Sequence, residues 1–259
     1  MKPSLLLLST LLTTIVQVLT SNTRIIGGIS TTIESHPYQV SIFVSGTFAD
    51  SGSIIAPNTV VTVAHCVSGS AAESFTIRAG SSSWNSGGKI LNVSNITVIP
   101  EYGKPVVLEN NIALITLAED LVFGVGVQAM KLPDPASAQD LEVPDICQEV
   151  VVSGWGNTKE RGSLSPTLQA CADAYADYVI PVTESMFCAG VPGGRKGSCQ
   201  VGSGGPVVAG DGDISLQETP SVYSRVVYFR EWVGSVTSFR LKGEPRHELV
   251  FVSRNEGHD

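Results

Sequence analysis

The chain has 259 residues and a net charge of −8, and 42% of its residues are apolar while only 15% are charged. This composition excludes a disordered, collagen-like or coiled-coil chain, and it supplies enough apolar material for one large domain or two small ones. The acidic balance argues against a nucleic-acid-binding surface. No apolar run of about 18 residues occurs away from the N-terminus, so no internal membrane span is expected.

The N-terminal residues are typical of a secretory signal peptide. Lys2 gives a positive start, residues 5–19 are mostly apolar, and small polar residues follow at 20–22. A membrane anchor is the alternative, but the apolar run is short and interrupted by threonines. We therefore expect residues 1–20 to be a signal peptide and the chain to be secreted and extracellular.

The cysteines and the glycosylation sequons also relate to the predicted secretion of the chain. Five cysteines are an odd number, so in an oxidising compartment at least one stays unpaired or pairs between chains. None is part of a C-x-x-C pair, so we predict no metal site and no cofactor. Glycosylation sequons begin at Asn92 and Asn95 and fit the secretory route, although such triplets also arise by chance.

The middle of the chain has the composition of β-strands. Segments rich in β-branched and aromatic residues are separated by short clusters of Gly, Asn, Pro and Ser; they include residues 38–44, 75–78, 90–99, 112–117, 150–152 and 222–228. This pattern favours an all-β sandwich or a pair of barrels. The Pro- and Asp-rich segment 132–146 is typical of a linker, and only residues 229–239 have helical spacing.

Two short motifs supply residues suited to nucleophilic acyl transfer. His65 follows the apolar run 54–63, and Ser203 lies in a glycine-rich segment. An imidazole can take the proton of a serine hydroxyl, and backbone N–H groups beside the serine can stabilise an oxyanion. Each motif alone is weak, because a histidine beside a strand is more often a packed residue and Gly-Ser-Gly-Gly is more often a flexible turn. Their order and spacing make the combination specific.

Motifs along nearly the whole chain point to one family: RIIGG at 24–28, TVAHCV at 62–67, SGWGNT at 153–158, MFCAGV at 186–191 and SCQ…SGGPVV at 198–208. Together they resemble the trypsin-like serine proteases, and the fungal trypsins in particular. The resemblance implies an all-β fold of two antiparallel β-barrels with a C-terminal helix, and an active site between the barrels.

The resemblance also implies the domain organisation. The protease domain would span 25–239, followed by a polar tail at 240–259. Within that domain we expect barrel one at about 25–125, a linker at 126–147, barrel two at 148–228 and the helix at 229–239. Residues 21–24 would be a short activation peptide, removed by cleavage between Arg24 and Ile25.

By the same resemblance, His65 would be the general base and Ser203 the nucleophile. The N–H groups of Val201 and Ser203 would form the oxyanion hole, and Gly197 and Ser198 would line the specificity pocket. Cys171 and Cys188 would form a disulfide, whereas Cys66 would lack its partner because Asp50 stands in that position.

Several positions depart from the family pattern. Asn111 stands where the family has its catalytic aspartate, and an asparagine can present an N–H that favours the wrong histidine tautomer. Glu109 is the candidate substitute carboxylate. Val201 and Gly202 replace Gly-Asp before the serine, and Gly197 replaces the aspartate that binds basic substrates. A strand that forms one wall of the pocket is missing after residues 206–208.

These departures leave three hypotheses open. The chain is a weakly active secreted endopeptidase, a non-catalytic homologue that binds a protein, or an incomplete product of a gene for an active trypsin. In each case we expect a monomer with a protein or peptide substrate or a protein binding partner, without nucleic acid or membrane.

Overall fold

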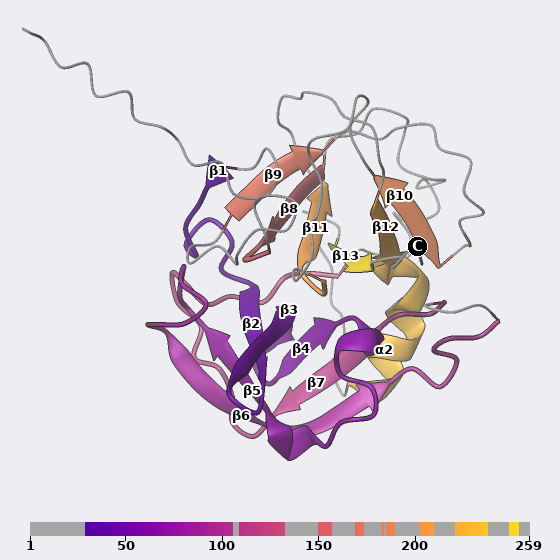
Figure 1. The fold of residues 1–259 in the computed structure, drawn as a ribbon, viewed down its shortest axis with the longest axis horizontal. Helices are drawn as coiled ribbons and strands as arrows, with labels where there is room; N and C mark the ends of the chain where they lie inside the picture. Colours follow the sequence, from indigo (N-terminus) through magenta and orange to yellow (C-terminus); the bar gives the residue numbers. More distant parts are fainter. Residues whose placement is uncertain are drawn as a thin grey trace, which may run out of the picture.

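The computed structural model describes residues 29–105, 109–132, 150–156, 169–173, 183, 185–189, 203–209, 221–237 and 249–253. Within these residues the chain forms two β halves, one made of the early strands and the other mainly of the late ones (Figure 1). The all-β fold predicted from the sequence is confirmed. No helix in the described part of the chain is long and apolar enough to cross a membrane.

The first half is a closed six-stranded barrel. Its strands are β2 (Gln39–Val44), β3 (Thr47–Ala56), β4 (Thr59–Thr62), β5 (Phe75–Ala79), β6 (Lys89–Val98) and β7 (Ala113–Leu117), in the spatial order β2-β3-β4-β7-β6-β5. Alternate residues point into the barrel, as in β5, where Phe75, Ile77 and Ala79 are buried and the residues between them are partly exposed. A cluster of Val, Ile, Leu, Ala and Phe side chains fills the interior.

The second half is a seven-stranded sheet, antiparallel throughout. It contains β1 (Ile29–Ser30), β8 (Val150–Gly154), β9 (Gln169–Asp173), β10 (Met186–Ala189), β11 (Pro206–Ala209), β12 (Ser221–Arg225) and β13 (Leu249–Ser253), in the order β1-β9-β8-β11-β13-β12-β10. The N-terminal strand β1 pairs with β9 and so joins the start of the chain to the second half.

Strand β13 lies in a part of the chain that the sequence suggests is a polar tail. It pairs antiparallel with β11 on one side and with β12 on the other. β13 therefore lies between β11 and β12, at the gap that the loss of the pocket-wall strand expected from the sequence would leave. The physical reason is that an unfilled gap would leave the backbone N–H and C=O groups of both strands without partners.

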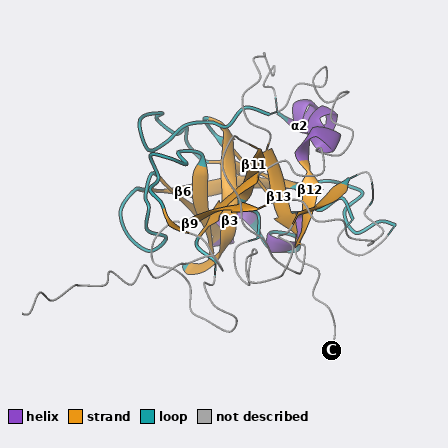
Figure 2. Ribbon diagram, turned by 90° about the horizontal axis from the view of Figure 1, so that it is seen from above, coloured by secondary structure: helices purple, strands orange, loops and turns teal. Residues whose placement is uncertain are grey.

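The helix predicted for residues 229–239 is present as α2 (Arg230–Val236), preceded by a 3₁₀ turn at Val226–Phe229. Phe229 and Val233, four residues apart, are both buried in a cluster that also contains Ile112 and Leu114 of the first half. Figure 2 shows α2 at one side of the strands. The helix therefore ties the late part of the chain to the first barrel.

Candidate active site

His65 lies on a short 3₁₀ turn, Ala64–Cys66, directly after strand β4. The backbone N–H groups of Val67 and Ser68 both donate to the carbonyl of Ala64, at 3.1 and 2.8 Å. Because Ala64 is fully buried, it anchors the turn, while the side chain of His65 is only partly buried. The turn therefore holds the imidazole at the rim of the barrel.

Asn111 contacts His65 at two points. Its side-chain Oδ1 accepts the backbone N–H of His65 at 2.9 Å, and its Nδ2 lies 2.8 Å from His65 Nδ1. Asn111 is buried, and its carbonyl accepts the hydroxyl of Ser224 on β12 at 3.1 Å, which fixes its backbone from the second half. The structure thus places Asn111, the residue predicted to stand in for the aspartate, beside His65.

The backbone contact decides which way the amide faces. A backbone N–H can only donate, so the atom that accepts it is the amide oxygen, and the amide nitrogen faces Nδ1. The NH₂ group of Asn111 then donates to Nδ1, which must act as an acceptor. In a neutral imidazole the proton therefore lies on Nε2.

Ser203 is held against the first barrel by its neighbours. Its carbonyl accepts the N–H of Ser51 on β3 at 3.1 Å, and Ser203 is 9% exposed. Gly204 follows with φ of +69°, and a Cβ there would collide with Thr62 Oγ1 and with the carbonyl of Ser51. Only glycine fits this close approach, so the serine segment sits directly on β3 and β4.

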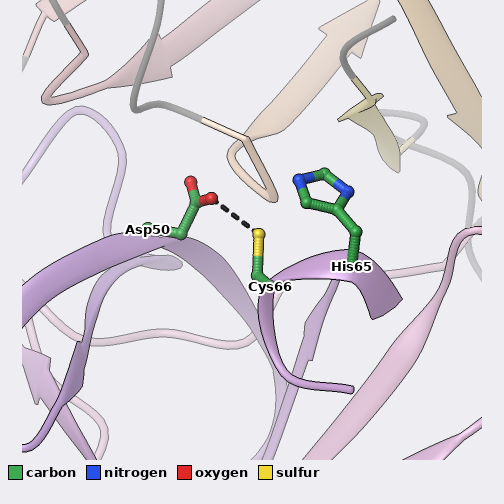
Figure 3. Close-up of side chains that lie close together, drawn as sticks. All are labelled: Asp50, His65 and Cys66. Atoms are coloured by element: carbon green, nitrogen blue, oxygen red, sulfur yellow. Dashed lines mark hydrogen bonds between the residues drawn. The ribbon is translucent and has the colours of Figure 1, made fainter. Parts of the chain in front are cut away.

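A buried carboxylate and thiol lie beside the histidine. Asp50 Oδ2 accepts the S–H of Cys66 at 2.6 Å, and Asp50 Oδ1 accepts the N–H of Ser51 at 3.0 Å. Burial raises the pKa of Asp50 to about 7, although the two hydrogen bonds oppose this shift. Burial and the neighbouring Asp50 also raise the pKa of Cys66, whose thiol is free. Figure 3 shows one ring nitrogen of His65 pointing to the side on which Asp50 and Cys66 lie.

Glu109 does not replace the missing aspartate at His65. Its Oε1 accepts the hydroxyls of Thr183 at 2.8 Å and Ser185 at 2.6 Å, and the residue is buried. Asn111 is the residue that contacts the Nδ1 atom of His65. Glu109 instead joins the first half to the segment before β10.

Other predicted site residues cannot be placed in the same way. Arg24, Ile25, Gly197, Ser198 and Val201 lie outside the described residues. Their roles stay predictions.

The disulfide and glycosylation predictions also stay untested. Cys171 lies on β9 and Cys188 on β10, but their side chains lie outside what the structure describes. Asn92 and Asn95 are exposed on β6, and Asn95 Nδ2 donates to Thr97 Oγ1 of its own sequon at 3.1 Å.

Comparison with known proteins settles the family. A family model described as Trypsin matches residues 25–233, most of the chain. The chain belongs to the trypsin family. The fold and the order of His65, Asn111 and Ser203 along this trypsin-family chain agree with that assignment.

Several curated relatives are similar over most of their length. A vitellin-degrading protease of Bombyx mori is 36% identical, covering 85% of this chain and 88% of the relative. Trypsin epsilon of Drosophila erecta is 33% identical, over 81% and 86% of the two chains. Trypsin alpha-4 of Lucilia cuprina is 34% identical, over 83% and 88%. Serine protease chemistry is therefore the chemistry of the family to which this chain belongs.

Sequence reasoning missed one feature of the site. It identified Asp50 only as the residue that deprives Cys66 of a disulfide partner. The structure brings Asp50, His65 and Cys66 together from two elements, with one ligand atom of each within 4.8 Å of the others. The sequence does contain a signal for this cluster, because a carboxylate that replaces one cysteine of a disulfide is expected to face the thiol of the other. No local sequence motif, however, links Asp50 to His65 and Cys66.

Proposed function

We propose that this trypsin-family chain is a secreted homologue whose peptidase activity is weak or lost, and which binds a protein or peptide between its two halves. One observation carries the proposal: the amide of Asn111 donates to Nδ1 of His65 while its oxygen is occupied by the backbone N–H of His65. The nitrogen that should take the proton of Ser203 therefore already carries one.

The size of the effect is large. An aspartate could accept both the backbone N–H and a proton on Nδ1, and it would stabilise the imidazolium that forms during the reaction. Replacing that aspartate by asparagine in a serine protease lowers turnover about 10⁴-fold, or about 5 kcal/mol in the barrier. The replacement of Gly-Asp by Val201 and Gly202 adds a second defect, because Gly202 offers no carboxylate to a new N-terminus at Ile25.

A binding role is supported by the contacts that join the two halves near His65. Ser203 and Gly204 pack on β3 and β4, and Ser224 of β12 contacts Asn111, so the two halves meet at the residues that would surround a substrate. The relatives are proteases and thus proteins that act on polypeptides. We propose a protein or peptide as the partner, bound by a monomer in the extracellular space, with glycans at Asn92 or Asn95.

The test compares the purified chain, cleaved after Arg24, with a Ser203→Ala control. We expect no burst with a serine-reactive phosphonate and equal peptidase rates for the two proteins. A rate above that of the control would overturn the proposal and favour the weakly active endopeptidase.

A repair series separates the defects. Asn111→Asp alone should recover little, because Val201 and Gly202 still stand where the family has Gly-Asp. The triple variant N111D/V201G/G202D should gain more than the three single changes together, since residues that act as a unit are non-additive. Full recovery by Asn111→Asp alone would contradict the proposal, because it would mean that Val201 and Gly202 do not impair the reaction.

A further inference from the structure

We propose that Asp50, His65 and Cys66 form a binding site for Zn²⁺ or a divalent transition metal ion of similar ligand preference. A carboxylate oxygen, an imidazole nitrogen and a thiol sulfur lie within 4.8 Å of one another (Figure 3). Carboxylate, imidazole and thiolate are the three kinds of side-chain ligand that Zn²⁺ takes in proteins. Three protein ligands leave a fourth tetrahedral position for water.

The distances require only a small adjustment. Zinc–ligand bonds of about 2.0–2.3 Å place tetrahedral ligand atoms roughly 3.3–3.7 Å apart. Asp50 Oδ2 and Cys66 Sγ, now 2.6 Å apart, would separate by about 1 Å, and His65 would stay in place or move inward. Rotation about the side-chain bonds of Asp50 and Cys66 can provide this movement.

The ligands lie on elements that are already fixed. Asp50 is on β3, where its backbone pairs with Ile42 of β2. His65 and Cys66 share the 3₁₀ turn that Ala64 anchors. Asp50 is 6% exposed, whereas His65 and Cys66 are partly exposed, so an ion can reach the site from their side.

The electrostatics of Asp50 favour a cation. The two groups that donate hydrogen bonds to it, the thiol of Cys66 and the N–H of Ser51, are both uncharged. A buried carboxylate held only by neutral donors is costly to ionise, and a bound cation would supply the missing charge. When the metal–sulfur bond forms, the thiol proton leaves to solvent, and the carboxylate and the imidazole contribute lone pairs.

Asn111 acts as a positioning residue that opposes this site. The nitrogen of His65 that faces Asp50 and Cys66 is Nε2, because Nδ1 contacts Asn111. A metal on Nε2 requires the proton on Nδ1, where Asn111 presents an N–H instead of an acceptor. A carboxylate at position 111 would accept that proton, and outer partners of this kind typically change metal affinity by about 10–100-fold.

The experiment titrates the purified full-length protein, reduced and freed of metal, with Co²⁺ and then with competing Zn²⁺. We expect a cobalt–thiolate charge-transfer absorption, tetrahedral d–d bands, and displacement by one equivalent of Zn²⁺. Cys66→Ser should abolish the charge-transfer absorption, and Asp50→Asn should weaken Zn²⁺ binding at least 10-fold. His36→Gln, which removes another histidine of the same barrel, should leave binding unchanged.

Asn111→Asp provides an independent arm, because it should tighten Zn²⁺ binding about 10–100-fold while leaving all three ligands in place. Circular dichroism verifies that each variant is folded, and Asp50→Asn and Asn111→Asp suffice if Cys66→Ser unfolds. The absence of a thiolate band in the unmodified chain would overturn the proposal. So would a band that survives Cys66→Ser, or an Asn111→Asp variant that binds no tighter. None of these readouts depends on peptidase activity, so they are separate from the proposed function.

Discussion

The two most informative residues around His65 are Asn111 and Asp50, which lie on opposite sides of the imidazole. On the Nδ1 side, the neutral amide of Asn111 stands where the trypsin family has a carboxylate. Near Nε2, the carboxylate of Asp50 stands where the family has a half-cystine. A carboxylate is thus absent on the Nδ1 side, where it would help the histidine act as a base, and a buried carboxyl group with a pKa of about 7 lies on the other side of the ring.

Asp50→Cys should create a disulfide with Cys66. The side-chain atoms of the two residues already touch, at 2.6 Å between Oδ2 and Sγ, and a bridge over a loop of this size contributes about 3 kcal/mol. The measurement is the urea midpoint under oxidising and reducing conditions, with thiol titration of Cys66. Asp50→Ser is the control, because serine is similar in size to cysteine but cannot form a disulfide with Cys66. Persistence of the free Cys66 thiol in the oxidised variant would contradict the geometry.

His36 should make the protein less stable in acid. It is buried against Tyr38, whose hydroxyl lies 3.1 Å from Nδ1, and burial lowers its pKa below 6.5. Below pH of about 6.5 the unfolded chain therefore binds a proton at this residue that the folded chain does not, so stability falls as pH decreases through that range.

The measurement for His36 is the free energy of unfolding between pH 5 and pH 8, with His36→Gln as the comparison. The unmodified chain should lose more stability on acidification than His36→Gln does. Parallel pH profiles for the two proteins would show that His36 titrates alike in the folded and unfolded chains.

At the scale of elements, β13 is the strand on which the second sheet most depends, because both of its edges are paired. Val250 lies opposite Val207 of β11 and Arg225 of β12. A proline there cannot donate to the ladder and is poorly tolerated in a central strand. Val250→Pro should therefore expose the amides of β11 and β12 to rapid hydrogen exchange and lower the stability by several kcal/mol, out of about 5–15 for a typical domain.

Val125→Pro is the matched control for that substitution. Val125 is exposed and follows Gly124 in a turn closed by the Val127 N–H and the Gly124 carbonyl, a position that proline favours. Equal protection of β11 and β12 in the two variants would show that β13 is dispensable.

The strands that the sequence predicts correctly are those whose own composition specifies them. Segments 38–44, 75–78 and 90–99 are rich in β-branched and aromatic residues and correspond to β2, β5 and β6. The polar first part of β3, with Asp50, Ser51 and Gly52, has low strand propensity. It is extended because β2 pairs along it.

β13 was not predicted from the sequence, for a different reason. Its composition suits a strand, but its partners lie on both sides of a gap that only the folded sheet reveals. The site shows the same limit. The roles of His65, Ser203 and Asn111 follow from motifs in linear order, whereas the meeting of Asp50 with Cys66 and the engagement of Glu109 by hydroxyls arise from tertiary contacts.

At the scale of the whole molecule, several polar contacts among the described residues connect the two halves. Glu109 accepts hydroxyls from Thr183 and Ser185, and Ser153 Oγ donates to Gln39 Oε1 at 2.7 Å. Trp155 Nε1 donates to the carbonyl of Ser82 at 3.0 Å. These contacts are buried or partly buried, so losing one partner leaves a polar group without compensation.

Glu109→Ala should loosen the association of the halves and destabilise the protein by about 1–3 kcal/mol. In a denaturant titration of this variant, we expect the tryptophan fluorescence to change at a lower denaturant concentration than the circular dichroism signal of the β-structure. Glu119→Ala, which removes an exposed carboxylate paired with Lys89, is the control and should change little. Coincident transitions with undiminished stability would show that Glu109 does not hold the halves together.

The position of β13 also has a consequence for the order in which the molecule can be made. Every strand of the first barrel precedes residue 118, so that barrel can close while the ribosome is still adding later residues. The second sheet cannot be completed in the same way, because β11 and β12 are synthesised before the strand that lies between them. Until β13 is synthesised, strands β11 and β12 each have an unpaired edge where β13 will later bind. Unpaired strand edges can form wrong pairs within the chain or aggregate with other nascent chains. The yield of folded protein in a cell should thus depend on how quickly translation passes from β12 to β13.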